Sequence, residues 1–159
     1  MENIIELNDC IIIADILNKA FMTVALQFNY TRENAPQFPA FISSELIEYN
    51  IANGLKMYGY CNNSKIIGCV GYSHYKDQIY LIKRLATLPE FRHLGVGKKL
   101  MEFIENKICE SNGKVAELHA VDENKTLIEW YEKLGYAKIR IDEIKSLPFN
   151  SYVMNKKLA

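Results

Sequence analysis

Three strand-like segments follow one another in the middle of the chain with only short turns between them. Each segment is rich in β-branched and aromatic residues, and the separating residues Asn62, Asn63 and Ser64, then Lys76 and Asp77, are typical of tight turns. Connections this short join antiparallel strands, because a parallel pair needs a crossover of a dozen or more residues. The sequence therefore predicts an antiparallel meander over residues 55–61, 65–75 and 78–87.

Helical segments lie on both sides of this predicted meander. Apolar residues recur at the helical period in four places, with capping residues such as Ser43 and Asn124 at their starts and glycines such as Gly135 at their ends. We expect helices over residues 8–28, 43–54, 96–113 and 124–135, and further strands over residues 114–121, 136–141 and 151–158.

The length, composition and charge of the chain exclude several classes of protein. The chain has 159 residues, 49% of them hydrophobic, and its 19 basic and 19 acidic residues balance without a run of like charge. The length indicates one domain over residues 1–159, and the composition and charge argue against disorder and against a nucleic-acid partner. Acidic residues precede the short apolar run near the N-terminus, and we expect a soluble, cytoplasmic protein with no membrane partner. The four cysteines lack paired metal-ligand spacing, so we expect reduced thiols and no metal.

The stretch EFRHLGVGKK, residues 90–99, places two glycines at the start of the third predicted helix. A helix start presents unpaired N–H groups and the positive end of the dipole, and Gly95 and Gly97 would let an anion approach the backbone. A nucleotide P-loop is disfavoured because Arg92 and Lys99 stand where it needs Gly and Ser or Thr. The dinucleotide fingerprint is disfavoured because Leu100 replaces its third glycine. On these residues alone, a phosphate site and an ordinary glycine turn both stay open.

Two longer stretches, RLATLPEFRHLGVGKKLMEFI and NKTLIEWYEKLGYAK, resemble the GNAT superfamily of N-acetyltransferases. Arg92, Gly95 and Gly97 fall on the Arg/Gln-x-x-Gly-x-Gly/Ala signature of that family, and Asn124 with Tyr131 falls on its second motif. The resemblance is close over residues 79–138 and looser elsewhere. It implies a GNAT-type α/β fold: a mixed, mainly antiparallel central sheet of six to seven strands with a splayed central pair, flanked by about four helices.

The resemblance also implies that acetyl-CoA is the cosubstrate. The glycine loop would bind its pyrophosphate through backbone N–H groups, with Arg92 and His93 at the rim, and the preceding strand would hold the pantetheine arm. Asn124 would contact the pantetheine. The same residue can also cap the helix that it precedes, because the two roles do not exclude each other. The cofactor-binding residues implied in this way are Leu85, Ala86, Thr87, Arg92, His93, Leu94, Gly95, Val96, Gly97, Lys98, Asn124 and Tyr131.

The reaction implied is direct attack of an amine on the thioester through a tetrahedral intermediate, with Tyr131 protonating the departing sulfur. For the base, the sequence departs from a common pattern of the family, because Leu81 and Lys83 occupy the strand positions where many members carry glutamate. In another branch of the family a carboxylate twelve positions before the tyrosine takes the role, and here that position is His119. A chain of water molecules is the competing path for the proton.

The acceptor is expected to be a small amine, an amino acid or a protein amino group. The N-terminal helices and their loop form the acceptor wall in the family, and here they are aromatic and polar without dense acidity, which disfavours a strongly polycationic acceptor. We predict Phe28, Tyr30 and Tyr72 as substrate-binding residues. Because the strand glutamate is missing, a non-catalytic acyl-CoA-binding or sensing module stays the alternative, and a monomer and a homodimer are both compatible with the sequence.

Overall fold

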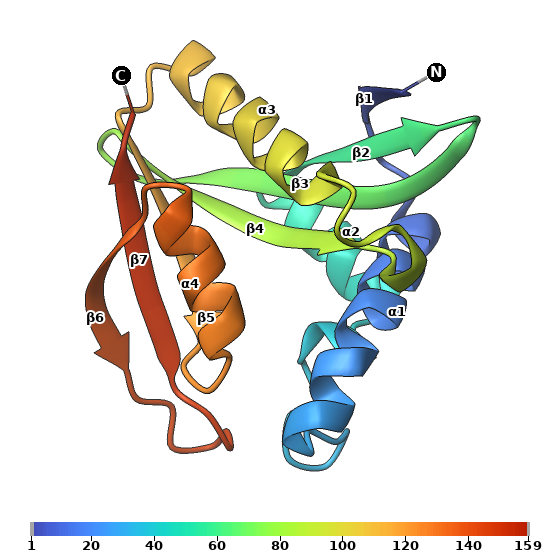
Figure 1. Cartoon of the computed structure of the whole chain (residues 1–159), viewed down its shortest axis with the longest axis vertical. Helices are drawn as coiled ribbons and strands as arrows, with labels where there is room; N and C mark the ends of the chain where they lie inside the picture. Colours follow the sequence, from blue (N-terminus) through green and yellow to red (C-terminus); the bar gives the residue numbers. More distant parts are fainter. Residues whose placement is uncertain (1, 159) are drawn as a thin grey trace.

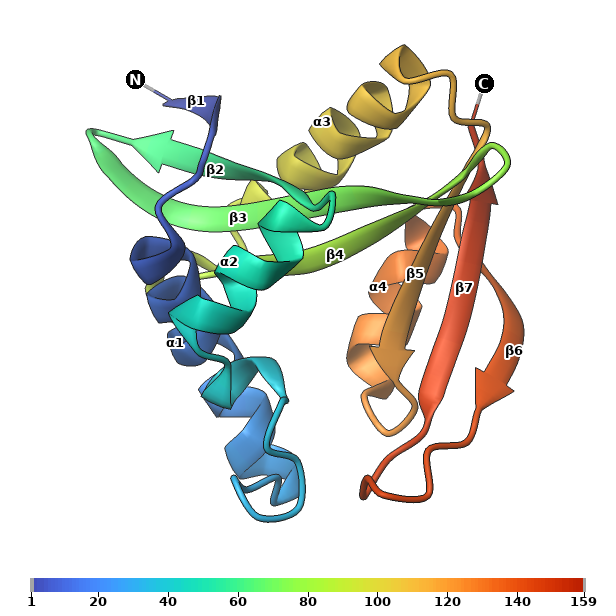
Figure 2. The ribbon, with the colours of Figure 1, turned by 180° about the vertical axis from the view of Figure 1, so that it is seen from behind.

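The computed structural model describes residues 2–158, and Figures 1 and 2 show it from opposite sides. The short 3₁₀ helices η1 (Pro39–Phe41) and η2 (Pro89–Phe91) precede α2 and α3. The main elements are, in order, β1 (Glu2–Glu6), α1 (Cys10–Phe28), α2 (Ser44–Ala52), β2 (Lys56–Asn62), β3 (Lys65–Lys76), β4 (Ile79–Thr87), α3 (Val96–Glu110), β5 (Val115–Val121), α4 (Lys125–Lys133), β6 (Ala137–Asp142) and β7 (Ser151–Lys157).

All strands join one sheet in the order β1-β2-β3-β4-β5-β7-β6. The β4–β5 pair is parallel, and every other neighbouring pair in the sheet is antiparallel. The predicted mixed sheet, the antiparallel meander and the four flanking helices are therefore confirmed. The sequence analysis did not assign β1, whose two adjacent isoleucines do not alternate with polar residues; the strand forms by pairing with the edge of β2.

The centre of the sheet is splayed between β4 and β5. Their pairing begins at Ile79 opposite Val115 and ends at Leu81 opposite Glu117. Beyond Leu81 the two strands diverge, as Figure 1 shows, and the rest of β4 has no strand neighbour on this side. The expected splayed pair is confirmed, and it leaves backbone groups of β4 available to a ligand between the strands.

The helices cover the two faces of the sheet unequally. Helices α3 and α4 lie on one face, and α1 and α2 lie on the other, over β3 and β4 (Figures 1 and 2). On the face of α1 and α2, the β5-β7-β6 half of the sheet carries no helix in the described part of the chain (Figure 2). Side chains on this face of the half-sheet are therefore covered by one another and by loops, and they include both the buried Glu117 and the exposed His119.

Helix α1 begins at Cys10 after Asp9, whose side chain accepts hydrogen bonds from the N–H groups of Ile11 and Ile12. By length and composition it is apolar enough to cross a membrane. In this structure its stripe of buried residues, including Ile13 and Leu17, belongs to the main core together with residues of the sheet and α3. The apolar stripe of α1 therefore packs in the core, as in an amphipathic helix of a globular domain.

Candidate active site

The glycine loop connects η2 to α3 through two residues in the left-handed region, His93 at φ 64° and Gly95 at φ 83°. Gly95 caps α3 without a side chain, and a methyl group at this position would meet no atom within 4 Å. The first N–H groups of a helix, here those of Val96, Gly97 and Lys98, have no acceptor inside the helix. The loop therefore combines open space, unpaired donors and the positive end of a dipole, which together suit a phosphate group.

Arg92 is held by α1. Its Nη1 donates to Thr23 Oγ1 at 3.0 Å and its Nη2 donates to the carbonyl oxygen of Ala20 at 2.5 Å. The side chain thus fastens the glycine loop to the N-terminal helix. The side chains of His93, Leu94 and Lys98 are exposed around the loop, whereas Val96 is buried in the core beneath it.

A β-bulge interrupts β4 just after the splay begins. Gly71 pairs with Lys83 and Cys69 pairs with Ala86, so that Arg84 and Leu85 together face a single residue of β3, and Arg84 has φ 59°. The bulge changes the direction of the strand before Leu85, Ala86 and Thr87, the segment predicted to hold the pantetheine. Thr87 lies beside the glycine loop, with its Oγ1 4.0 Å from the position of a methyl group on Gly97.

Arg84 itself was not singled out by the sequence analysis. Its Nη2 donates to Asn50 Oδ1 of α2 at 3.2 Å, which places the guanidinium on the α1 and α2 face, and its buried Nε has no partner among residues 2–158. Burial lowers the pKa of Arg84, and burial together with the charge of Arg84 lowers the pKa of Lys83. No described carboxylate forms an ion pair with either side chain.

Helix α4 carries the predicted acid. Asn124 caps the helix, its Oδ1 accepting from the N–H of Leu127 at 3.2 Å, as predicted for a capping residue. Tyr131 is buried between Trp130 and Tyr136, with ring centroids 5.2 and 6.0 Å away, and burial raises the pKa of its phenol. The ring of Trp130 lies 3.4 Å from the position of a methyl group on Gly97, so α4 reaches the start of α3.

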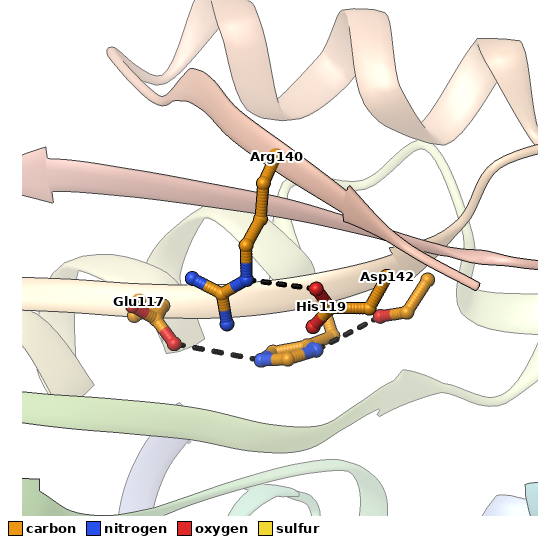
Figure 3. Close-up of polar contacts among 5 residues, drawn as sticks. Glu117, His119, Arg140 and Asp142 are labelled. Carbon is orange, nitrogen blue, oxygen red and sulfur yellow. Dashed lines mark hydrogen bonds and ion pairs between the residues drawn. The ribbon is translucent and has the colours of Figure 1, made fainter. Parts of the chain in front are cut away.

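On the face of β5 over which no described helix lies, Glu117 and His119 are two residues apart and therefore point the same way. Glu117 is 4% exposed, and its Oε2 lies 3.5 Å from His119 Nε2 (Figure 3). His119, whose side chain is 42% exposed, has its Nδ1 2.8 Å from Ser151 Oγ of β7. The sequence analysis placed Glu117 on the same face as His119 but gave it no role.

Tyr131 and His119 come from opposite faces of the sheet at its splayed centre. Helix α4 lies on one face of β5 (Figures 1 and 2), and the side chains of Glu117 and His119 lie on the other face (Figure 3), at and just beyond the last β4–β5 pair. The predicted acid and the predicted base are thus carried on opposite faces of the sheet, and both roles stay predictions. This arrangement suits group transfer between two ligands that approach from opposite faces.

The predicted acceptor residues do not all come together. Phe28 stacks on Tyr30, which is buried in a second aromatic cluster with Phe38 and Phe149, and Tyr30 Oη donates to Glu123 Oε1 at 2.6 Å. This cluster ties the loop after α1 to the loop before β7. Tyr72 instead lies apart from it, buried against Tyr58 and Tyr80, with its hydroxyl 3.3 Å from Ser111 Oγ at the end of α3.

Comparison with known proteins identifies the relatives of this chain. The sequence model of the acetyltransferase (GNAT) family matches residues 18–136. That span includes the glycine loop, the splayed strands and α4. A comparison with curated protein sequences gave no significant match.

Solved structures agree over nearly the whole chain. A GNAT-family acetyltransferase from Staphylococcus aureus Mu50 has a TM-score of 0.76 at 22% identity, with both chains fully covered. The PaiA N-acetyltransferase of Thermoplasma acidophilum, solved with coenzyme A, has a TM-score of 0.81 at 19% identity, with 99% of each chain covered. The ribosomal-protein-S18-alanine N-acetyltransferase of Escherichia coli has a TM-score of 0.79 at 16% identity, covering 100% of this chain and 95% of its own. At these identities the likeness concerns the fold.

Proposed function

Because this chain belongs to the GNAT family of acetyltransferases, we propose that it moves the acetyl group of acetyl-CoA to a primary amine by direct attack. The observation that carries the proposal is the splay between β4 and β5, with α4, the helix of Tyr131, on one face of β5 and the side chain of His119 on the other. In this proposal the thioester lies in the splay, with Tyr131 as the proton donor on one side and His119 as the proton acceptor on the other. A module that only binds acyl-CoA would not require a proton acceptor such as His119.

The glycine loop and β4 form the acetyl-CoA side of the proposed site. The unpaired N–H groups at the start of α3 suit the pyrophosphate, and the open space at Gly95 leaves room for it. Backbone groups of Leu85, Ala86 and Thr87, which have no β5 partner, would hold the pantetheine arm. Arg92 contributes by positioning the loop, since its guanidinium is bound to α1.

In the proposed reaction, the amine nitrogen forms a bond to the carbonyl carbon, and the carbon–sulfur bond breaks. Tyr131 gives its proton to the departing sulfur; burial, which raises its pKa, keeps the phenol protonated at neutral pH. The proton of the attacking amine leaves on the opposite side, toward His119. The phenol is restored by a proton from solvent after the thiol departs.

The charges on the acceptor side favour a neutral or acidic amine. Lys83 and Arg84 lie on β4 without carboxylate partners, and together they would repel a polycationic acceptor. PaiA and the ribosomal-protein-S18-alanine enzyme are named as N-acetyltransferases, which is consistent with an amine acceptor. A small amine, an amino acid and a protein amino group are all within this proposal.

The test has two stages. Saturating acetyl-CoA should raise the melting temperature of the protein by mass action, with coenzyme A as the comparison ligand. Thiol release is then measured over a panel of amines that spans acidic, neutral and polycationic members. Thermal stabilisation without release on any amine would contradict the catalytic proposal, and absence of stabilisation would contradict acetyl-CoA binding as well.

A further inference from the structure

We propose that Arg84 binds a carboxylate group of the acceptor, so that the amine substrate is one that carries a carboxylate, as an amino acid does. The proposal rests on the proposed function and names the substrate class of the same site. The side chain of Arg84 reaches the acceptor side from the bulge in β4.

Arg84 lies where the two central strands have separated. The last pair of β4 and β5 is Leu81 with Glu117, and Arg84 follows three residues after Leu81 on β4. Its Nη2 donates to Asn50 Oδ1 of α2 at 3.2 Å, so the guanidinium lies on the face of α1 and α2. His119 follows two residues after Glu117 on β5, with its side chain on the face opposite α4. Arg84 and His119 thus belong to the two strands that border the splay, and both side chains lie on the same face of the sheet (Figures 2 and 3).

The protein leaves the guanidinium of Arg84 incompletely paired. Asn50 accepts one hydrogen bond from it, and the buried Nε has no partner among residues 2–158. No carboxylate in that part of the chain forms an ion pair with Arg84. A cation that is largely removed from water is costly unless an anion pairs with it, and an unpaired buried donor adds to this cost. A bound carboxylate would supply the missing negative charge.

Lys83, the residue before Arg84, adds a second positive charge on the same face. Lys83 is two residues after Leu81, whose partner Glu117 points away from α4, so the lysine points that way too. Burial and the charge of Arg84 lower the pKa of Lys83, and no described carboxylate is paired with it. One anion bound here would reduce the repulsion between the two cations.

The shape of the guanidinium suits a carboxylate. Arginine presents its donors in a planar fork that matches the two oxygens of a carboxylate, and such charge-assisted bonds are stronger than a bond to a neutral amide. A ligand carboxylate would therefore be a better partner for Arg84 than the amide oxygen of Asn50. The amine of the same molecule would extend toward the splay, where the proposed function places the thioester.

The first test measures binding without turnover. Calorimetric titration in the presence of coenzyme A compares amino acids with their carboxamides, which keep the amine and lack the carboxylate. In wild type we expect the best amino acid to bind at least about tenfold more tightly than its carboxamide, and Arg84→Met should abolish this difference. Lys56→Met, which removes an exposed cation of β2, should retain it. Equal affinities for the two ligands in wild type would overturn the proposal.

A second variant keeps Arg84 and pairs it within the chain. Asn50→Asp places a carboxylate where the present hydrogen-bond acceptor stands, so it would compete with the carboxylate of the ligand. It should weaken binding of the amino acid about tenfold and change binding of the carboxamide by no more than about twofold. This variant also decides the case in which Arg84→Met does not fold. Unchanged affinity for the amino acid in folded Asn50→Asp would contradict binding at Arg84.

Turnover separates the carboxylate site from the proposed function. The kcat/KM of thiol release, corrected for the fraction of neutral amine, should favour the amino acid over its carboxamide in wild type and Lys56→Met. The preference should disappear in Arg84→Met and Asn50→Asp. Equal turnover of both amines in wild type would overturn the carboxylate site and leave the acetyltransferase activity established. Carboxylate-dependent binding without turnover of any amine would refute the proposed function and leave Arg84 as a carboxylate-binding residue.

Discussion

Leu81 of β4 and Glu117 of β5 form the last pair of residues before the two central strands diverge. An apolar side chain and a buried carboxylate thus stand at the point where the sheet opens. The carboxylate is next to His119, whereas the family glutamate that the sequence analysis sought on β4 is absent. In this chain the acidic group at the splay comes from β5.

The hydroxyl of Tyr131 should matter for turnover and little for stability. Tyr131→Phe keeps the buried ring and removes only the proposed proton donor. We expect kcat to fall by about a hundredfold, which is within the usual range for loss of a general acid, with the Kd of acetyl-CoA nearly unchanged. Steady-state thiol release and calorimetric titration measure the two quantities. Tyr49→Phe, at an exposed tyrosine, is the control, and equal turnover in Tyr131→Phe would remove this residue as the acid.

Gly95 offers a test of the phosphate cradle with a matched control. Gly95 and Gly54 both have positive φ, 83° and 108°, and at both a methyl group would meet no atom within 4 Å. Each Gly→Ala substitution should therefore cost about 1–2 kcal/mol of stability through backbone strain alone. Gly95→Ala should in addition weaken acetyl-CoA binding about tenfold, because its methyl group projects into the proposed cradle. Equal affinities in the two variants would argue against binding at this loop.

Arg92 is expected to act by fastening the glycine loop to α1. Arg92→Ala removes hydrogen bonds to Thr23 and to the carbonyl of Ala20, and it should lower the free energy of unfolding by about 1–2 kcal/mol and raise the Kd of acetyl-CoA several-fold. Thr23→Val keeps the arginine charge and removes one of these bonds, so it should give a smaller change in the same direction. If Thr23→Val left the Kd intact while Arg92→Ala raised it, a direct contact of Arg92 with the phosphate would be the better account.

Cys69 should make the protein less stable at high pH. Burial raises the pKa of its thiol to about 12 from an ordinary value of 9.0, so the folded state keeps the proton while the unfolded state loses it. The stability that the neutral thiol provides is complete below pH 9 and declines between pH 9 and about 12, by about 1.4 kcal/mol per pH unit at most. Chemical denaturation at several pH values should show a shallower decline in Cys69→Ala. Parallel curves for the two proteins would contradict this assignment.

Local features of the site were predictable from short stretches of sequence. Asn124 caps α4 and Gly95 adopts a positive φ because such conformations depend on the residue and its immediate neighbours. The meander followed from strand-like runs joined by turns of two or three residues, which leave no room for another connection. The order of these elements along the chain then supported the resemblance to the family.

Other features depend on strand register and could not be predicted from the sequence. The bulge at Arg84 arises from the pairing of Cys69 with Ala86 and of Gly71 with Lys83. The local sequence KRLA contains no residue typical of a bulge. Tyr72, a predicted acceptor residue, takes its direction from the register of β3, which turns it toward Ser111 at the end of α3. A shift of one residue in the pairing would exchange the two faces, and such a shift cannot be read from composition.

The sequence by itself determined the helix starts, the glycine loop and the meander, because each depends on interactions over a few residues. Only the tertiary structure decided that Arg92 is bound to α1 and that Glu117 and Ser151 flank His119. Ser151 is 32 residues from His119 along the chain, and Arg92 is 72 residues from Ala20. Contacts over such separations form through the pairing of strands and the packing of helices on the sheet, and those depend on the whole core at once.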